Sequence, residues 1–316
     1  LLEMGGKLGV DLAVQRDDIF RRGKRLVCMD VDSTFVKGEF IDELADLVGV
    51  KSQVAEITAR AMRGELDFKE ALAERVRLLE GLPMSRAREL CDRFELTPTE
   101  FYERMAKATA AHHLLLDFHG AFKPTGLRRE YPNLITREGV AGMEQSKWSV
   151  LSDPEYCTAI PFIRMFAGPM DYTPGAMRNA QKDVFTANFD LPSSLGTRCH
   201  QLAMYTVFES PLQMLSDSPS AYDENPESRD FIAAVPVTWD ETRALDGRAG
   251  DFVVVARRNG ERWWLGAMTD WDAREVTVPL SFLGAGEWKA VLFEDGPEAA
   301  VKGTSHTRSE RAVSAS

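Results

Sequence analysis

Residues 114–120, LLLDFHG, decide the fold of the larger part of this chain. This segment predicts a short strand, and the residues before it, 101–112, predict a helix. A helix followed by a strand is the unit of an α/β barrel, in which functional side chains gather at the C-terminal ends of the strands. His119 lies at such an end, where a histidine serves either a site or only the packing. Asp117 lies within the strand and is expected to point into the packing.

Two glutamates follow this strand within a short stretch of sequence. Glu138 and Glu144 come after the sequence YPN at residues 131–133. If both face one cavity, they supply the pair of carboxyl groups that glycoside hydrolysis requires. Carboxylates also suit Ca2+. Paired glutamates are equally common on ordinary surfaces, so the spacing alone leaves both interpretations open.

The C-terminal part has the pattern of a small antiparallel β-sandwich. Two strand-like runs, 251–258 and 261–268, flank Asn259-Gly260, which is the strongest short hairpin signal. Further strands are expected at 276–278 and 288–293. The tryptophans at 263, 264 and 271 either pack in the sandwich or form a face for sugar stacking. The polar residues 304–316 predict a disordered tail.

The first part of the chain carries a different signal. Residues 25–29, RLVCM, predict a buried strand, and DVDST at 30–34 follows at its C-terminal end, where sites form in open α/β sheets. Two carboxylates two residues apart point the same way. One can attack phosphorus while the other handles a proton, with Mg2+ between oxygen ligands. The alternative is a loop that caps the next helix. Helices are expected at about 40–48, 51–63 and 69–80.

Composition separates these two parts and limits the partners. All five histidines, six tryptophans and six tyrosines of the 316 residues lie beyond residue 98, near the sequence LTPT at 96–99. The chain has 38 basic and 49 acidic residues, a net charge of −11, which speaks against a nucleic-acid partner. No apolar run is long enough to span a membrane. Leu1 is not followed by a leader sequence, so the location stays open and would be cytoplasmic for the chain as it stands.

Residues 1–98 resemble the phosphoserine phosphatases of the haloacid dehalogenase superfamily. The resemblance rests on MDVDST at 29–34, KGE at 37–39, AMRGELDF at 61–68 and ERV at 74–76. It implies that Asp30 is the nucleophile and Asp32 the general acid/base, both at a magnesium site. It also implies a phosphoserine pocket lined by Glu39, Met62, Phe68 and Arg75, in which Glu39 takes the amine and Arg75 the carboxylate. The family's later phosphate and magnesium motifs are not found in order within 99–316, so we expect very little phosphatase activity.

Residues 99–300 resemble glycoside hydrolase family 97, whose members are α-glucosidases and α-galactosidases that typically depend on calcium. The resemblance rests on DFHGAFKPTGLRR at 117–129, TREG at 136–139, GPMDYTPG at 168–175, HQLAMY at 200–205, SPLQM at 210–214 and TWDET at 238–242. It implies that Glu144 is the general acid, that Glu138 and Glu144 bind calcium, and that His119 contacts an α-linked saccharide.

The attacking group of that family is not apparent in this sequence. The inverting branch has a glutamate base directly after the histidine, where this chain has Gly120. The retaining branch has an aspartate nucleophile on the preceding barrel strand, and residues 85–98 in that place resemble the phosphatase instead. We therefore expect an inactive glycosidase fragment of the retaining branch fused to a phosphatase fragment. The alternatives are a phosphoserine phosphatase, a working glycosidase with an unusual N-terminal part, and a non-catalytic remnant that binds sugar and calcium.

The expected fold class is α/β in three parts. A partial haloacid dehalogenase-like strand with a helical cap is expected at 1–98 and the C-terminal half of a (β/α)8 barrel at 99–243. A truncated, small antiparallel β-sandwich is expected at 244–303, before the tail.

Overall fold

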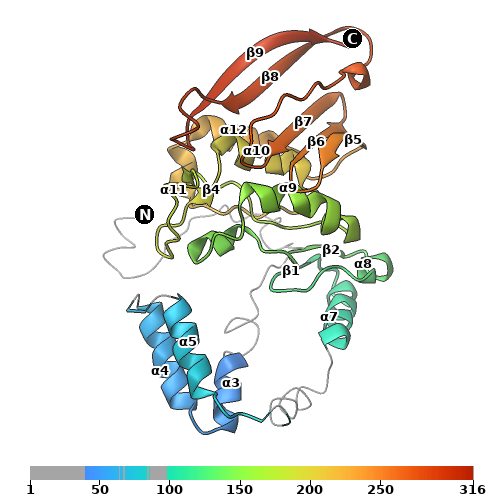
Figure 1. The fold of residues 1–316 in the computed structure, drawn as a ribbon. Helices are drawn as coiled ribbons and strands as arrows, with labels where there is room; N and C mark the ends of the chain where they lie inside the picture. The colour runs from blue at the N-terminus through green and yellow to red at the C-terminus, as the bar shows by residue number, and fades with distance from the viewer. Residues whose placement is uncertain (1–39, 64, 67, 84, 86–97, 316) are drawn as a thin grey trace, which may run out of the picture.

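The computed structural model describes residues 40–315 apart from 64, 67, 84 and 86–97 (Figure 1). In the described residues, helices and short parallel strands come first, and antiparallel sheets follow. No helix in the described part is long and apolar enough to cross a membrane.

Three helices form a group at the start of the described chain, and their bounds agree with the sequence pattern. Helix α3 contacts α4, and α4 contacts α5. Ala45, Val54, Ile57 and Ala71 are buried in this group, because small and branched apolar residues recur at helical spacing. The helices are α3 (Phe40–Leu47), α4 (Lys51–Met62) and α5 (Phe68–Leu78).

Residues 98–234, which we call the barrel-like part after the fold expected from the sequence, begin with a helix and a pair of parallel strands. Leu116 of the first strand pairs with Leu134 of the second, and both are buried together with Phe118 and with Ala106 of the helix. Parallel pairing brings the C-terminal ends of both strands to the same edge. The elements are α7 (Pro98–Ala111), β1 (Leu116–Phe118), α8 (Leu127–Glu130) and β2 (Leu134–Arg137).

The chain then continues through short helices and a second parallel pair of strands, β3 (Asn179–Ala180) and β4 (Ser194–Leu195). Within the described residues the two parallel pairs remain separate sheets. The helices of this stretch are η2 (Met143–Lys147), α9 (Pro154–Ile163), η3 (Met165–Ala167), α10 (Arg198–Val207), α11 (Pro219–Asp223) and α12 (Pro226–Ala234).

Two antiparallel sheets end the chain, and the three-stranded one packs on the barrel-like part. The predicted hairpin is present, but its two-residue turn is Gly260-Glu261, one residue later than predicted, because Asn259 is the last residue of the hairpin's first strand and pairs with Arg262. One core cluster joins Cys157 and Ile160 of α9 and Val207 of α10 to Val253 and Met268 of the sheet. The strands are β5 (Glu241–Arg248), β6 (Phe252–Asn259) and β7 (Arg262–Thr269), then β8 (Glu287–Asp295) and β9 (His306–Ser314).

The expectation of a disordered tail at 304–316 is wrong. Strand β9 pairs with β8 from Asp295–His306 to Glu287–Ser314. Lys289 forms an ion pair of 2.7 Å with Glu310 across the two strands. A polar segment can form a strand because the partner strand satisfies its backbone groups, and opposite charges pair across the ladder.

The strand expected at 276–278 is also wrong, because these residues lie in an irregular segment before η4 (Ser281–Leu283). Pro279 has no N–H to contribute to a sheet there. Two of the tryptophans pack on phenylalanine rings. The distance between ring centroids is 4.8 Å for Trp263 and Phe282 and 5.8 Å for Trp264 and Phe231.

Asp153 caps α9 and links it to the segment that follows β7. Its Oδ1 accepts the N–H of Tyr156 at 2.9 Å, and its Oδ2 accepts the indole N–H of Trp271 at 3.1 Å. We expect Asp153→Ala to lower the free energy of unfolding by about 1–2 kcal/mol, because the cap and the indole bond are both lost. Chemical denaturation measures this loss. Asp153→Asn keeps the cap acceptor and should lose less; equal losses for both variants would contradict the capping role.

Candidate functional site

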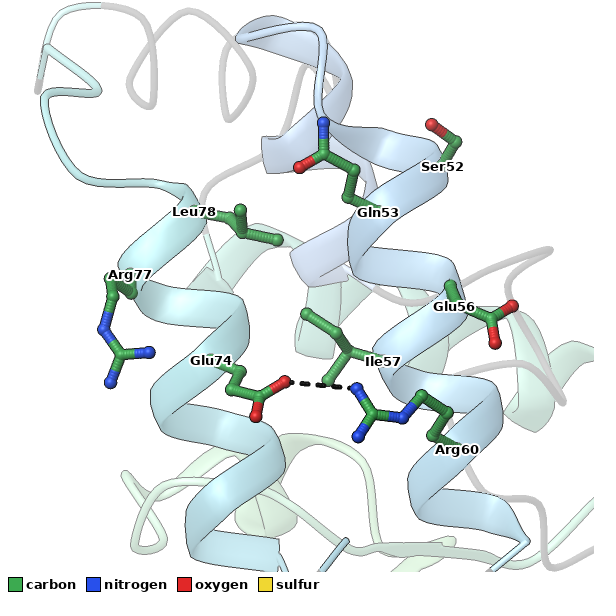
Figure 2. A pocket seen from close by; sticks show the side chains of 8 residues that line it. All are labelled: Ser52, Gln53, Glu56, Ile57, Arg60, Glu74, Arg77 and Leu78. Carbon is green, nitrogen blue, oxygen red and sulfur yellow. Dashed lines mark ion pairs between the residues drawn. The ribbon is translucent and has the colours of Figure 1, made fainter. Parts of the chain in front are cut away.

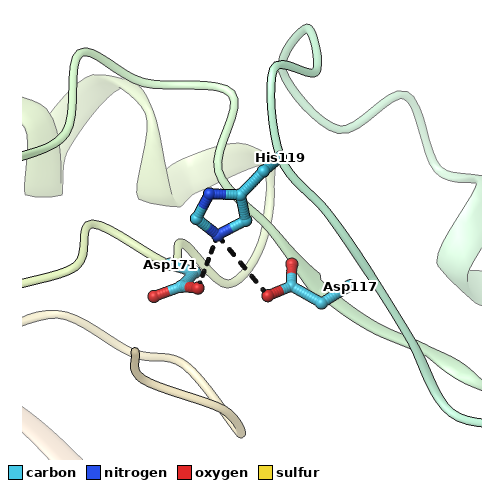
Figure 3. Close-up of side chains that lie close together, drawn as sticks. All are labelled: Asp117, His119 and Asp171. Atoms are coloured by element: carbon cyan, nitrogen blue, oxygen red, sulfur yellow. Dashed lines mark hydrogen bonds and ion pairs between the residues drawn. The ribbon is translucent and has the colours of Figure 1, made fainter. Parts of the chain in front are cut away.

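His119 lies among three carboxylates just beyond the end of β1. Its Nε2 is 2.7 Å from Oδ2 of Asp171 and 3.6 Å from Oδ2 of Asp117, and Figure 3 shows both carboxylates directed at that nitrogen. On the other edge of the ring, Nδ1 is 3.9 Å from Oε1 of Glu138. The side chain of His119 is 26% exposed, so the imidazole is the part of this cluster that solvent reaches.

The parallel pairing of β1 and β2 places Glu138 beside His119. The N–H of Glu138 donates to the carbonyl of Phe118 at 2.8 Å, which continues the pairing one residue beyond β2. The N–H of Gly120 in turn donates to Oε2 of Glu138 at 2.7 Å. The Glu138 carboxylate is therefore fixed across the ends of both strands, with Oε1 left facing the imidazole.

Asp171 reaches the same place from a loop that is distant in sequence. Its N–H donates to the carbonyl of Arg137 at 3.2 Å, and its Oδ1 accepts the N–H of Met214 at 3.1 Å. These two bonds anchor both the backbone and one carboxylate oxygen. Oδ2 is consequently held toward His119.

Burial and the surrounding negative charge set the protonation of this cluster. Burial raises the pKa of Asp117 to about 7, and the charge of Asp171 adds to this rise. Burial lowers the pKa of His119, but the hydrogen bond to Asp171 and the nearby carboxylates outweigh it and raise the value to about 9. Burial also raises the pKa of Glu138, and the charge of Glu144 contributes.

Glu144 occupies a different position from the other acids. It lies in the first turn of η2 and is exposed. Its charge acts on the Glu138 carboxylate, so the two predicted calcium ligands lie within electrostatic reach of each other. Two carboxylates from neighbouring loops are a donor set that calcium accepts, so these residues fit the expected ion. Their roles in acid catalysis and calcium binding stay predictions.

The phosphatase-like residues are described only in part. Asp30, Asp32 and Glu39 lie outside the described residues, as do the side chains of Met62 and Phe68. Arg75 lies on α5, where its Nη1 donates to Oγ1 of Thr58 on α4 at 3.4 Å.

A groove of about 540 Å³ lies between α4 and α5, and the Arg60–Glu74 ion pair of 3.5 Å crosses it (Figure 2). Arg75 is not among the residues that line this groove, and the phosphoserine pocket stays a prediction. Its lining residues are Ser52, Gln53, Glu56, Ile57, Arg60, Glu74, Arg77 and Leu78.

Two family profiles match the larger part of the chain. The profile described as glycoside hydrolase 97 matches residues 87–140, and the profile described as glycosyl-hydrolase 97 C-terminal, oligomerisation, matches residues 238–316. The larger part of the chain resembles glycoside hydrolase family 97. The first match begins before the boundary that we place near residue 98, and the second includes β9.

Relatives of family 97 cover about two thirds of the chain. A retaining alpha-galactosidase from Bacteroides thetaiotaomicron is 50% identical over 213 residues, which are 67% of this chain and 32% of that protein. A family 97 enzyme from Pseudoalteromonas sp. strain K8, solved with panose, has a TM-score of 0.62 at 38% identity, over 68% of this chain and 34% of that one. The chain thus spans about a third of the length of these relatives.

The other match is to a different kind of enzyme. A phosphoserine phosphatase from Archaeoglobus fulgidus is 52% identical over 91 residues, 29% of this chain and 26% of that protein. The phosphatase relatives cover a stretch separate from the family 97 relatives, so the chain is similar to two unrelated enzymes in turn.

Sequence reasoning identified His119, Glu138 and Glu144 but assigned no role to Asp171. The only available signal was its place in the GPMDYTPG motif, because nothing in the spacing connects it to a histidine 52 residues away. Asp117 is buried within β1, as its place in the strand predicts, and its carboxylate nevertheless faces His119.

Gly139 fixes the turn that directs Glu138. Its φ is +50°, and a Cβ there would lie 2.9 Å from the carbonyl oxygen of Phe122. We expect Gly139→Ala to lower the free energy of unfolding by about 1–3 kcal/mol, because both the conformation and the contact become unfavourable. Gly260→Ala is the matched control, since Gly260 has a similar φ of +59° but has nothing within 4 Å of its Cβ position. Equal losses in urea denaturation would show that the contact does not matter.

Proposed function

We propose that residues 98–315 form half of the catalytic site of a calcium-dependent, retaining α-galactosidase-type glycosidase, which binds an α-linked saccharide but does not complete its hydrolysis. The observation that carries this proposal is the grouping of His119 and Glu138, with Glu144 close by, at the C-terminal ends of two parallel strands. The 50% identity to a retaining alpha-galactosidase supports the substrate class.

Each residue has a specific part in this proposal. Glu144 is exposed on η2 and donates its proton to the glycosidic oxygen as the bond to the leaving group breaks. His119 offers the exposed edge of its ring to a sugar hydroxyl. Calcium, when bound, would offset the charge of Glu138 and Glu144 and fix their orientation. Glu138 is already oriented by the N–H of Gly120.

The attacking carboxylate is what this half-site does not supply. Gly120 stands where an inverting enzyme of the family has its base. Asp117 and Asp171 are buried, and both face the Nε2 side of His119 rather than solvent. Their burial argues against an approach to an anomeric carbon, and this supports the proposal that the half-site has acid and binding groups but no attacking carboxylate.

An external nucleophile tests this assignment. The full chain is incubated with calcium and an aryl α-galactoside, with and without azide. We expect aryloxide release only with azide: its nitrogen bonds to the anomeric carbon from the opposite face as the carbon–oxygen bond breaks. The product is then β-galactosyl azide, which mass spectrometry and NMR identify.

Calorimetry with the same sugar provides the matching binding measurement. Binding should require calcium, should weaken strongly in His119→Ala, and should be unchanged in Glu155→Gln, an exposed position on α9. Equal aryloxide release without azide would show that the chain has a nucleophile of its own. No binding and no rescue would refute the sugar site altogether.

Phosphoserine phosphatase chemistry is the second candidate, supported by the 52% identity over 91 residues. In this reaction Asp30 attacks the phosphorus of phosphoserine, and serine leaves with a proton from Asp32. Water then attacks the aspartyl phosphate, gives its proton to Asp32 and releases phosphate and Asp30. Mg2+, when bound, would offset the phosphate charge. We expect little phosphate release because later motifs of that family are not found in order. Magnesium-dependent release that Asp30→Asn abolishes would make this activity the principal one.

A further inference from the structure

The Nε2 side of His119 has the geometry of a small metal site that is distinct from the expected calcium ligands. One ligand atom each from Asp117, His119 and Asp171 lies within 4.8 Å of the others (Figure 3). Two ligand atoms that each lie about 2.1 Å from an ion, at right or tetrahedral angles, are about 3.0–3.4 Å apart. The distances from Nε2, 2.7 Å to Asp171 and 3.6 Å to Asp117, bracket that range.

Asp117 provides the second, independent observation. The residue is 7% exposed, and neither carboxylate oxygen has a hydrogen-bond partner within the described residues. The imidazole of His119, at 3.6 Å, is the contact of opposite charge that this buried carboxylate has, and binding a cation is one of the ways in which proteins offset the desolvation cost of such a group. Figure 3 shows this carboxylate aimed at the same point as that of Asp171.

The charges around the cluster leave room for a cation. Asp117, Glu138 and Asp171 contribute three carboxylates against one imidazole. Arg137 is the nearby buried guanidinium, but it donates to the carbonyl of Phe122 and lies over the rings of Tyr102, Phe118 and Phe122. Arg164 donates only to backbone carbonyls in the hydrogen bonds of the described residues. The charge of Arg137 acts on Asp117 from a distance, but neither guanidinium donates a hydrogen bond to Asp117 or Asp171 within the described residues.

The surroundings of the three residues support ligation. Metal-bound histidines usually present the other ring nitrogen to a carboxylate or carbonyl, and Glu138 lies on the Nδ1 side of this imidazole. The Oδ1 atom of Asp171 is occupied by the N–H of Met214, so Oδ2 is the atom left for a ligand. The hydrogen bond from Met214 thus orients the Asp171 carboxylate toward the proposed ion.

We propose that Asp117, His119 and Asp171 bind one small divalent transition-metal ion, of the zinc or manganese type, beside the predicted calcium ligands. An imidazole with two carboxylates suits such an ion, whereas calcium takes six to eight oxygen ligands at longer distances. This site goes beyond the proposed glycosidase function and does not depend on it, since it uses the opposite edge of the His119 ring from Glu138.

Metal binding is tested on the full chain in saturating calcium, which keeps Glu138 and Glu144 occupied if they bind that ion. Zn2+ is titrated by calorimetry, and X-ray absorption at the zinc edge identifies the ligands. We expect one ion per chain with a single imidazole among its ligands. Asp171→Asn, which retains the Oδ1 acceptor, and Asp117→Asn, which loses no hydrogen bond, should each weaken binding by about 100-fold or more.

Controls separate this site from surface binding and from the calcium ligands. Zinc affinity is measured for the chain and for the Asp117 and Asp171 variants, all of which also carry His112→Ala and His113→Ala. These two adjacent, exposed histidines are the obvious site for adventitious zinc. Glu144→Gln should leave zinc affinity unchanged while it weakens calcium binding.

Three results would overturn the proposal: no zinc binding in calcium, binding that both aspartate variants retain, or a bound zinc without an imidazole ligand. If a variant does not fold, the absorption spectrum of the double-alanine background still decides whether one imidazole and carboxylate oxygens hold the ion. Loss of sugar binding alone would refute the proposed function and leave the metal site standing.

Discussion

Replacing Arg164 with methionine is expected to destabilise the barrel-like part by about 4 kcal/mol or more. The Arg164 side chain is buried, and its guanidinium donates to five backbone carbonyls at 2.9–3.1 Å. Each buried carbonyl that loses its donor costs about 1–3 kcal/mol, so partial relaxation still leaves a large loss. The acceptors lie in two segments, at residues 137–139 and 168–169.

These two segments are the ones that direct the site. The first includes Glu138, and the second ends directly before Met170 and Asp171. Arg164 therefore acts as a bridge between the loop after β2 and the loop after η3. Burial lowers the pKa of Arg164 to about 10, so the guanidinium keeps its proton, and all its donors, at neutral pH.

Tryptophan fluorescence during urea denaturation measures this effect in the correct part of the molecule, because all six tryptophans lie beyond residue 98. Arg128→Met on α8 is the control, since that side chain is exposed. Arg164→Lys can donate only three hydrogen bonds from one point, so its loss should fall between those of the control and Arg164→Met. A loss below about 1 kcal/mol for Arg164→Met would contradict the bridging role.

The helices and the hairpin could be predicted from sequence because their signals are local. Helices α3, α4 and α5 follow the spacing of their apolar residues, and the hairpin of β6 and β7 forms within one residue of the Asn259-Gly260 signal. Strand β9 could not be predicted in this way, because its polar residues become a strand only through pairing with β8. A local sequence pattern therefore does not predict a strand that forms only because a distant strand pairs with it.

The candidate site divides along the same line. His119 and Glu138 were found because His119 lies at the end of the predicted strand 114–120 and Glu138 lies in the quoted motif TREG at 136–139. Asp171 and Arg164 were not, because their roles consist of contacts with backbone and side chains brought together only by folding. Carboxylates lie on both edges of one imidazole because the parallel pairing of β1 and β2 places Glu138 on one side, while a distant loop brings Asp171 to the other.

His200 is expected to make the chain less stable in mild acid, by roughly 3 kcal/mol between pH 6.5 and pH 4. It lies in the first turn of α10 and is buried, and its Nε2 has no hydrogen-bond partner within the described residues. Burial lowers its pKa to about 4, although the charge of Asp153 partly opposes this. The N-terminal end of a helix is also an unfavourable place for a positive charge.

The direction of the effect follows from proton binding by the two states. Below pH 6.5 the unfolded chain takes up a proton at His200, while the folded chain does not until the pH approaches 4. The stability that the neutral imidazole provides is therefore complete above pH 6.5 and decreases as the pH falls through that interval. This contribution ends once both states are protonated.

Comparing His200→Phe with the unmodified chain isolates this contribution. The variant carries a constant cost or gain from repacking, but it has no proton to bind, so its stability should fall less steeply between pH 6.5 and pH 4. The difference between the two urea-derived stability curves should widen at higher pH by roughly 3 kcal/mol. His112→Gln, at an exposed position, should reproduce the slope of the unmodified chain. Parallel curves for His200→Phe and the unmodified chain would mean that His200 takes up its proton equally in the folded and unfolded states.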